Sequence, residues 1–370
     1  MLKKYRVLNY NFRLALYVVA LTVMGILAIG SADETLQERQ IAGFLVALFL
    51  MVALSLVNYS LVLRFHWVIY VVNIILLAMV YFTGVTVNNA KRWVEIFGIQ
   101  FQPSETAKIL LILFYAWFVM RCADRLNTVK NLFLSLVLIA PTLAFIYVQP
   151  DLSTTIVIMM IFCVILYIGG LSWKIIVAVL AVVVPAGLIF LAIVTNPSAD
   201  SEVLFEHQQN RIVAFLNKEA YSLAEGYQQE NSVMAIGSGQ LYGKGYKNNL
   251  FSSVKNANYI AEQETDFIFA VIGEEFGFIG TSAVIVLVML ITMECLMIAR
   301  RAKDLAGTII ATAMGSMIGL QGFINIGVAT YVLPNTGLTL PFVSYGLTSL
   351  VSAYIGMGFV LNVGLQRQAK

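Results

Sequence analysis

The stretch QETDFIFAVIGEEFG, residues 263–277, carries acidic side chains into a long apolar run. Thr265 is predicted to cap a helix, with Asp266 in its first turn, where the helix dipole favours an ionised carboxylate. Capping alone explains Asp266, and the alternative is a general base at the outer surface of a membrane. Glu274 and Glu275, deeper in the helix, are expected to pair or form hydrogen bonds within a bundle. Three glycines share the predicted helical face of Asp266 and favour close packing of another helix: Gly273, Gly277 and Gly280.

A second group of charged residues lies in AKRWVEIFGIQFQPSETAK, residues 90–108. Pro103 suits the first turn of a helix. Glu105 and Lys108 are three residues apart on one helical face, so they are expected to form an ion pair. The pair either holds a helix bundle together or, with Arg92, presents positive charge to an anionic ligand while Glu105 orients Lys108.

Three further polar segments are predicted to face the same side of the membrane. In QPDLSTT, residues 149–155, Asp151 is expected to cap the helix that follows. The glycine-rich AIGSGQLYGKGY contains Lys244 and, with Arg211 upstream, suits a phosphate-bearing headgroup, although a solvated loop is the simpler interpretation. Ser344 lies in NTGLTLPFVSYGLTS, an irregular segment expected to be buried in protein or to line a cavity. These segments together predict a polar cavity open to the outside.

The elements that hold these residues are predicted from composition. Hydrophobic residues make up 60% of the 370 positions and charged residues 12%, and the mean hydropathy is +0.85. Soluble domains carry about 25% charged residues, so this chain is predicted to be an all-α, polytopic membrane protein. The net charge of +3 is too small to indicate a nucleic-acid partner. The three cysteines have no metal-ligand spacing and are interpreted as packing residues: Cys122, Cys163 and Cys295.

Apolar runs predict a single membrane domain, residues 1–370, with ten spans and an uncleaved first span. The spans are 12–31, 41–59, 68–86, 105–121, 131–148, 152–170, 173–195, 266–299, 305–333 and 342–363. Most of the 23 Lys and Arg residues then fall at one side, which places both termini in the cytoplasm. A large loop, about 196–265, faces outward before the eighth span.

Five of these motifs, in order along almost the whole chain, resemble those of the SEDS family (shape, elongation, division and sporulation), whose branches include RodA, FtsW and SpoVE. They are AKRWVEIFGIQFQPSETAK, QPDLSTT, NSVMAIGSGQLYGKGY, TDFIFAVIGEEFGFIG and LPNTGLTLPFVSYG. The short terminal tails make the chain most similar to the RodA branch. Five residues depart from the family pattern: Ser153, Gln240, Glu264, Leu347 and Thr348.

The resemblance implies a peptidoglycan glycosyltransferase in the bacterial cytoplasmic membrane, with a class B penicillin-binding protein as its transpeptidase partner. Its substrate would be lipid II, and its essential acid would be Asp266, the general base. Candidate groups for the substrate and its pyrophosphate are Arg92, Glu105, Lys108, Arg211, Lys244 and Ser344. A divalent metal, Mg²⁺ or Mn²⁺, is left open because no ligand set is visible. The alternatives are a flippase for lipid-linked precursors, a scaffold that recruits a synthase, or the division or sporulation branch.

Overall fold

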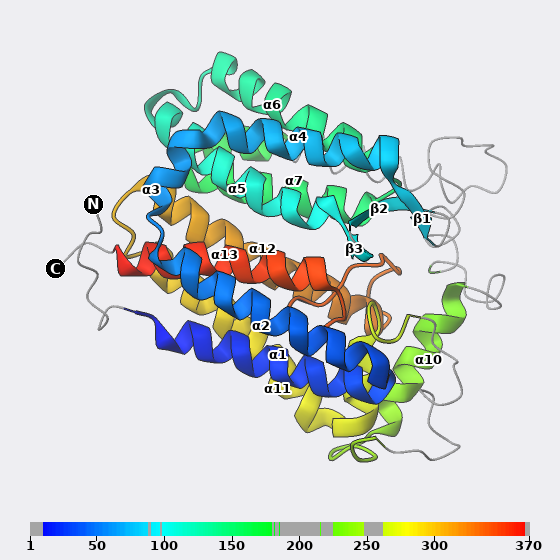
Figure 1. Ribbon diagram of the computed structural model, residues 1–370. Coiled ribbons are helices and arrows are strands. Elements are labelled where there is room, and N and C mark those ends of the chain that lie inside the picture. Colours follow the sequence, from blue (N-terminus) through cyan, green and yellow to red (C-terminus); the bar gives the residue numbers. More distant parts are fainter. Residues whose placement is uncertain are drawn as a thin grey trace, which may run out of the picture.

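The computed structural model describes residues 10–87, 90–96, 98–179, 225–247 and 262–366, with positions 181, 185 and 215. This part of the chain forms a bundle of long helices that run up and down beside one another (Figure 1). The helices are α1 (Phe12–Ala32), α2 (Glu34–Leu56), α3 (Tyr59–Val62), α4 (His66–Thr83), α5 (Pro103–Cys122), α6 (Val129–Val148), α7 (Leu152–Ile168), α10 (Glu225–Ser238), α11 (Ile268–Ala299), α12 (Leu305–Ala329) and α13 (Leu347–Leu365).

Eight helices in the described ranges are long and apolar enough to cross a membrane, and α7 is a shorter apolar helix. Hydrocarbon offers no hydrogen-bond partners, so such runs must satisfy their backbone groups internally as helices. The chain is therefore a multi-pass membrane protein. Of the predicted seventh span, 173–195, only residues 173–179, 181 and 185 are described, and these are helical. Most of the predicted loop, 196–265, lies outside the described residues.

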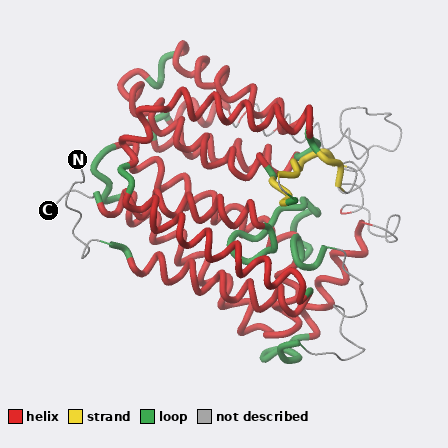
Figure 2. The backbone as a smooth tube through the Cα atoms, in the orientation of Figure 1, coloured by secondary structure: helices red, strands yellow, loops and turns green. Residues whose placement is uncertain are grey.

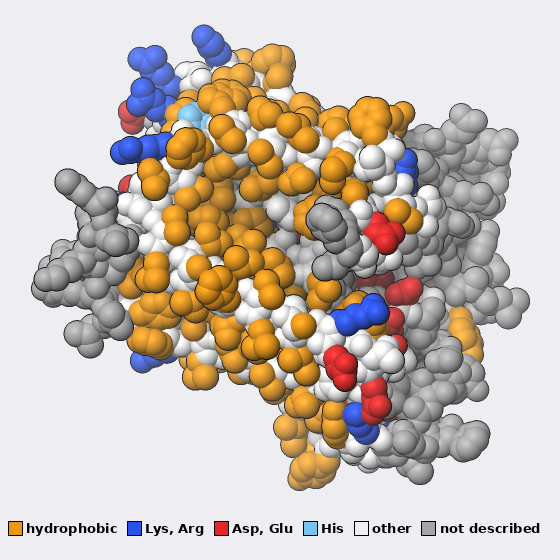
Figure 3. Space-filling model, in the orientation of Figure 1, with side chains coloured by type: hydrophobic (Ala, Val, Ile, Leu, Met, Phe, Trp, Pro, Cys, Tyr) orange, Lys and Arg blue, Asp and Glu red, His pale blue; other side chains and the backbone are white. Residues whose placement is uncertain are grey.

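Hydrophobic side chains cover most of the visible flank of the bundle, and charged side chains gather toward its two ends (Figure 3). The first residues of α1 and the last of α13 lie at one end, whereas α10 and the start of α11 lie at the other (Figure 1). At the core, α13 packs on α2, and α11 packs on both α12 and α1. This arrangement puts the predicted polar segments at a single end of the molecule.

The predicted all-α class is wrong in one place, because three short strands connect α4 to α5 (Figure 2). β1 (Val85–Val87), β2 (Ala90–Ile96) and β3 (Ile99–Phe101) form an antiparallel sheet in that order. Gly98 has a φ of +77°, which allows the tight turn between β2 and β3. Trp93, Val94 and Ile96 in the run AKRWVEI are of the aromatic and β-branched types that favour strands.

The long helix α11 is bent at Gly277, whose φ of 63° and ψ of −157° are not helical. The nine residues before this kink are almost all buried, whereas Phe278 and Ile279 directly after it are exposed. The predicted alignment of Asp266 with Gly277 and Gly280 on one straight face is therefore wrong, since the two halves of α11 have different axes.

Candidate functional site

Asp266 lies in a short run of turns, residues 262–267, that precedes α11; we call this segment the Asp266 turn. The main-chain N–H groups of Thr265 and Asp266 donate to the carbonyl oxygen of Glu262, at 3.2 and 3.1 Å. The hydroxyl of Thr265 also donates to this oxygen, and the residue before the helix is Phe267, which gives no side-chain cap. The predicted capping role of Thr265 is therefore wrong, because its hydroxyl is used within the turn.

Polar groups from the segment between α12 and α13, residues 330–346, and from α12 itself hold the Asp266 turn in place. Asn325 Nδ2 donates to the carbonyl oxygens of Asp266, at 2.8 Å, and Leu338, at 2.7 Å. Ser344 Oγ donates to the carbonyl oxygen of Thr265 at 2.5 Å. The N–H of Tyr345 donates to the carbonyl oxygen of Glu264 at 2.9 Å. The backbone of residues 264–266 is thus held by α12 and by the α12–α13 segment. Asp266 itself is partly exposed.

The same α12–α13 segment joins the Asp266 turn to distant parts of the bundle. The buried Gln40 of α2 donates to the carbonyl oxygen of Ser344 at 3.2 Å. Gln40 Oε1 accepts from the N–H of Gly346 at 3.5 Å, and Ser153 of α7 donates to the carbonyl oxygen of Thr336. Sequence reasoning missed Gln40, because its hydrogen bonds depend on which segment packs beside α2.

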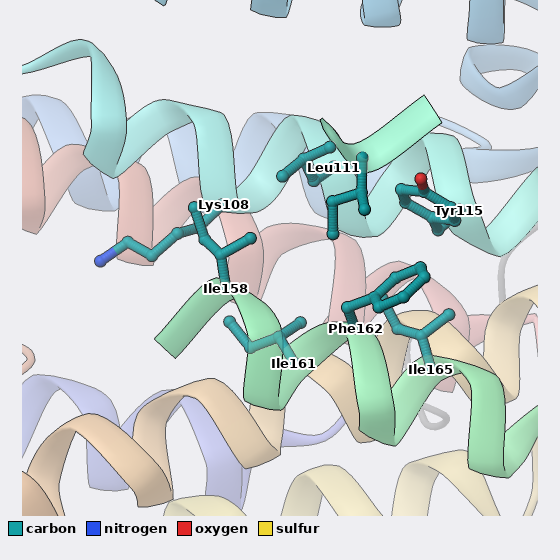
Figure 4. A pocket seen from close by; sticks show the side chains of 8 residues that line it. Lys108, Leu111, Tyr115, Ile158, Ile161, Phe162 and Ile165 are labelled. Carbon is teal, nitrogen blue, oxygen red and sulfur yellow. The ribbon is translucent and has the colours of Figure 1, made fainter. Parts of the chain in front are cut away.

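The predicted ion pair on α5 is confirmed. Lys108 Nζ lies 2.8 Å from Glu105 Oε1, and Lys108 is almost entirely buried. The Lys108 side chain borders an apolar space between α5, α6 and α7, with its ammonium pointing away from Tyr115 and Phe162 (Figure 4). The positive charge is therefore matched by Glu105, and the space beyond it is lined by apolar groups and the Tyr115 ring.

Arg92, on β2, lies against the turn between α6 and α7. Its guanidinium donates to the carbonyl oxygens of Gln149, at 3.2 Å, and Pro150, and lies 3.9 Å from Asp151. Asp151 accepts from the N–H of Thr154 at 3.1 Å, so its predicted capping of α7 is confirmed. The carboxylate of Asp151 lies farther from Arg92 than that of Glu105 lies from Lys108, 3.9 Å against 2.8 Å, so the charge of Arg92 is less closely paired.

Lys244 pairs with a buried acid of α11. Its Nζ lies 2.7 Å from Glu274 Oε1, and Ser31 Oγ donates to Glu275. Both glutamates therefore bond within the bundle, as predicted. The main-chain N–H groups of Lys244 and Gly245 donate to carbonyl oxygens of α11. The predicted anion-binding role of Lys244 stays a prediction, and Arg211 lies outside the described residues.

The surroundings of the Asp266 turn are acidic. Burial is the main cause that raises the pKa of Glu264, and the negative charges of Glu262 and Asp33 raise it further. No three His, Cys, Asp or Glu side chains among the described residues gather in a group that could hold a metal ion. The Mg²⁺ or Mn²⁺ of the sequence analysis stays a hypothesis.

Comparisons with known proteins find relatives along almost the whole chain. The model of the FTSW_RODA_SPOVE cell cycle protein family matches residues 6–369. The peptidoglycan glycosyltransferase MrdB of Escherichia coli K12 is 33% identical over 361 residues, which cover 95% of this chain and 93% of MrdB. A chain from a peptidoglycan synthase complex that coordinates polymerization and crosslinking is 28% identical, with a TM-score of 0.78 over 98% of this chain and 99% of that one. The rod shape determining protein RodA of Thermus thermophilus is 26% identical, with a TM-score of 0.70 over 98% of both chains.

Proposed function

Because this chain belongs to the FtsW, RodA and SpoVE family of cell cycle proteins, we propose that it polymerises lipid II into glycan strands. It is a peptidoglycan glycosyltransferase, like the relative MrdB. The observation that carries this function is a carboxylate, Asp266, on a turn whose backbone is held by Asn325, Ser344 and Tyr345. A reacting group must be held in a narrow range of positions, and such bonding provides that.

In the proposed reaction, the 4-hydroxyl of the acceptor sugar attacks the anomeric carbon of the donor. The new glycosidic bond forms as the bond to undecaprenyl pyrophosphate breaks, with inversion at that carbon. Asp266 accepts the hydroxyl proton as general base. The leaving pyrophosphate is dianionic or more, so cations that stabilise it lower the barrier.

Among the proposed cations, Arg92 is the strongest candidate of the described residues. Its guanidinium is held mainly by carbonyl oxygens, whereas Lys108 and Lys244 each contact a carboxylate at under 3 Å. An arginine also binds two phosphate oxygens at once. Glu105 then holds the ammonium of Lys108 in place, and Ser344 holds the Asp266 turn through its hydrogen bond to the carbonyl oxygen of Thr265.

We further propose ten spans in the bacterial cytoplasmic membrane, with both termini in the cytoplasm and the loop of residues 196–265 outside. The start of α1 and the end of α13 at one end of the bundle support this orientation (Figure 1). Basic residues at that end support it as well, because short cytoplasmic loops are rich in Lys and Arg. They include Arg64, Arg121, Arg125 and Lys130.

A class B penicillin-binding protein is the proposed partner, and elongation is the proposed cellular role. The similarity to a chain of a peptidoglycan synthase complex supports the partner, since that complex couples polymerization to crosslinking. The similarity to RodA of Thermus thermophilus supports the elongation branch.

The test is a polymerisation assay with the full chain purified together with its candidate partner. Labelled lipid II is supplied, and glycan polymer is measured for wild type, Asp266→Asn and, as a control, Glu262→Gln in the same turn. Loss of a general base lowers kcat about 100- to 10,000-fold, so Asp266→Asn is expected to lose nearly all polymer while Glu262→Gln keeps most of it. Full-rate polymer from Asp266→Asn would remove Asp266 from the mechanism. Wild-type protein that moves lipid II across liposomes without making polymer would favour a flippase.

A further inference from the structure

The kink at Gly277 leaves four main-chain groups of α11 without helical partners. The carbonyl oxygens of Glu274 and Glu275 lie before the kink, and the N–H groups of Phe278 and Ile279 lie after it. Gly277 is nine residues from the start of α11, about 14 Å along a helix axis, so the kink lies within a membrane-crossing helix. Unsatisfied backbone groups at such depth are strongly unfavourable, because hydrocarbon offers them no partner.

A second segment satisfies all four groups. In residues 239–245, which we call the glycine loop, the N–H groups of Lys244 and Gly245 donate to the carbonyl oxygens of Glu274 and Glu275, at 2.9 and 3.1 Å. The carbonyl oxygens of Gln240 and Leu241 accept from Phe278 and Ile279, at 2.7 and 3.3 Å. The loop therefore pairs main chain to main chain with both sides of the break, and Lys244 adds its ion pair to Glu274.

This pairing requires glycine at three closely packed positions. A Cβ on Gly239 would lie 1.9 Å from the carbonyl oxygen of Gly273, and one on Gly243 would lie 2.0 Å from that of Glu275. A Cβ on Gly277 would lie 2.4 Å from the N–H nitrogen of Gly243. By contrast, a Cβ on Gly237, two residues earlier in α10, meets no atom within 4 Å. The glycines thus mark a contact between two backbones, and a flexible loop would not need them.

We propose that the glycine loop is a positioning element for catalysis: it fixes the kink of α11 and thereby sets where the Asp266 turn meets the α12–α13 segment. The buried part of α11, residues 268–276, connects the kink to the turn without an intervening loop. A shift at Gly277 is therefore passed to Asp266, against Asn325 and Ser344. The part of this proposal that concerns catalysis rests on the function proposed above.

The experiment compares Gly239→Ala with the matched control Gly237→Ala in the full chain with its partner. Neither glycine has a positive φ, so the pair differs in packing and not in backbone strain. The new Cβ of Gly239→Ala requires the loop and α11 to separate by about 1 Å, and a displacement of that size costs about 100-fold in rate. We expect kcat to fall about 100-fold with KM for lipid II unchanged, because substrate binding does not need the base. Gly237→Ala is expected to match wild type.

A second measurement follows the pairing itself, by hydrogen exchange of the Lys244, Gly245, Phe278 and Ile279 amides. We expect faster exchange at these four amides in Gly239→Ala and wild-type exchange in Gly237→Ala. If Gly239→Ala does not fold, Gly273→Ala serves instead, since its Cβ approaches Ile236 at a milder 2.9 Å.

The outcomes separate the two proposals. Wild-type kcat in Gly239→Ala, or a loss of kcat without faster exchange at these amides, would overturn the positioning role. If wild-type protein makes no polymer, the proposed function fails instead, and the exchange comparison still decides whether the glycine loop holds the kink.

Discussion

Asn325 offers the sharpest test of how the acid is held, because one side-chain nitrogen bonds to two carbonyl oxygens from separate segments. The substitution Asn325→Leu keeps the size of the side chain and removes both bonds. Each hydrogen bond contributes about 0.5–1.5 kcal/mol, and each buried carbonyl left unpaired costs more, so the docked turn should lose about 2–4 kcal/mol. This loss shifts the turn away from its docked position. We expect kcat to fall about 10- to 100-fold while KM for lipid II stays close to wild type.

The matched control is Asn362→Leu, in α13 at the opposite end of the bundle. Asn362 is fully buried, donates to the carbonyl oxygen of Ser55 at 2.7 Å and accepts from the N–H of Tyr59 at 3.0 Å. Its replacement removes these two hydrogen bonds and a third, from Gln366 Nε2 at 2.6 Å, without touching the Asp266 turn. Both variants are expected to melt at lower temperature than wild type, and only Asn325→Leu should lower the kcat of the folded protein.

The assay is the lipid II polymerisation described above, combined with thermal unfolding of the same preparations in detergent. Wild-type kcat in Asn325→Leu would refute the idea that Asn325 positions the acid. An equal loss of kcat in Asn362→Leu would also refute it, because both residues would then act through overall stability.

Three further predictions concern the charged groups around the site. Glu105→Gln leaves the buried Lys108 without its carboxylate and should destabilise the fold by about 3–5 kcal/mol, measured as a lower melting temperature. Lys244→Met should likewise destabilise through the buried Glu274, and adding Glu274→Gln should restore much of the stability in a double-mutant cycle. Because its pKa is raised on folding, Glu264 binds its proton more tightly in the folded protein than in the unfolded chain. The resulting stabilisation is fully present below pH 4.5, the ordinary glutamate pKa, and is lost as pH rises through the raised pKa of the folded protein. Glu264→Gln should therefore match wild type in thermal stability at about pH 4 and exceed it increasingly at higher pH.

Features that depend on neighbours along the chain could be predicted from the sequence. Apolar runs give helices because hydrocarbon leaves the backbone no other partner. The pairing of Glu105 with Lys108 follows from their spacing of three on one helix, and the capping by Asp151 follows from its place before α7. The family motifs singled out Asp266 as the essential carboxylate that acts as general base, and this role stays a prediction.

Features that depend on contacts between distant residues required the tertiary structure. Asp266 is followed 59 positions later by Asn325, and Gln40 bonds to Ser344 across 304 positions. Thr265 was predicted to cap a helix, yet its hydroxyl bonds within the turn and its carbonyl oxygen accepts from Ser344. Local spacing cannot reveal such partners, because they depend on which helices become neighbours.

The stretch QETDFIFAVIGEEFG contains both local features and features that depend on tertiary contacts. The sequence alone predicted that this stretch forms an apolar helix with an acid at its start, because an apolar run in lipid must satisfy its backbone groups as a helix. Only the tertiary structure decided that the helix breaks at Gly277 and that the glycine loop satisfies the broken backbone. The physical reason is that lipid solvates all apolar helices in a similar way. The neighbours of each helix are therefore selected by close backbone packing and by hydrogen bonds between segments.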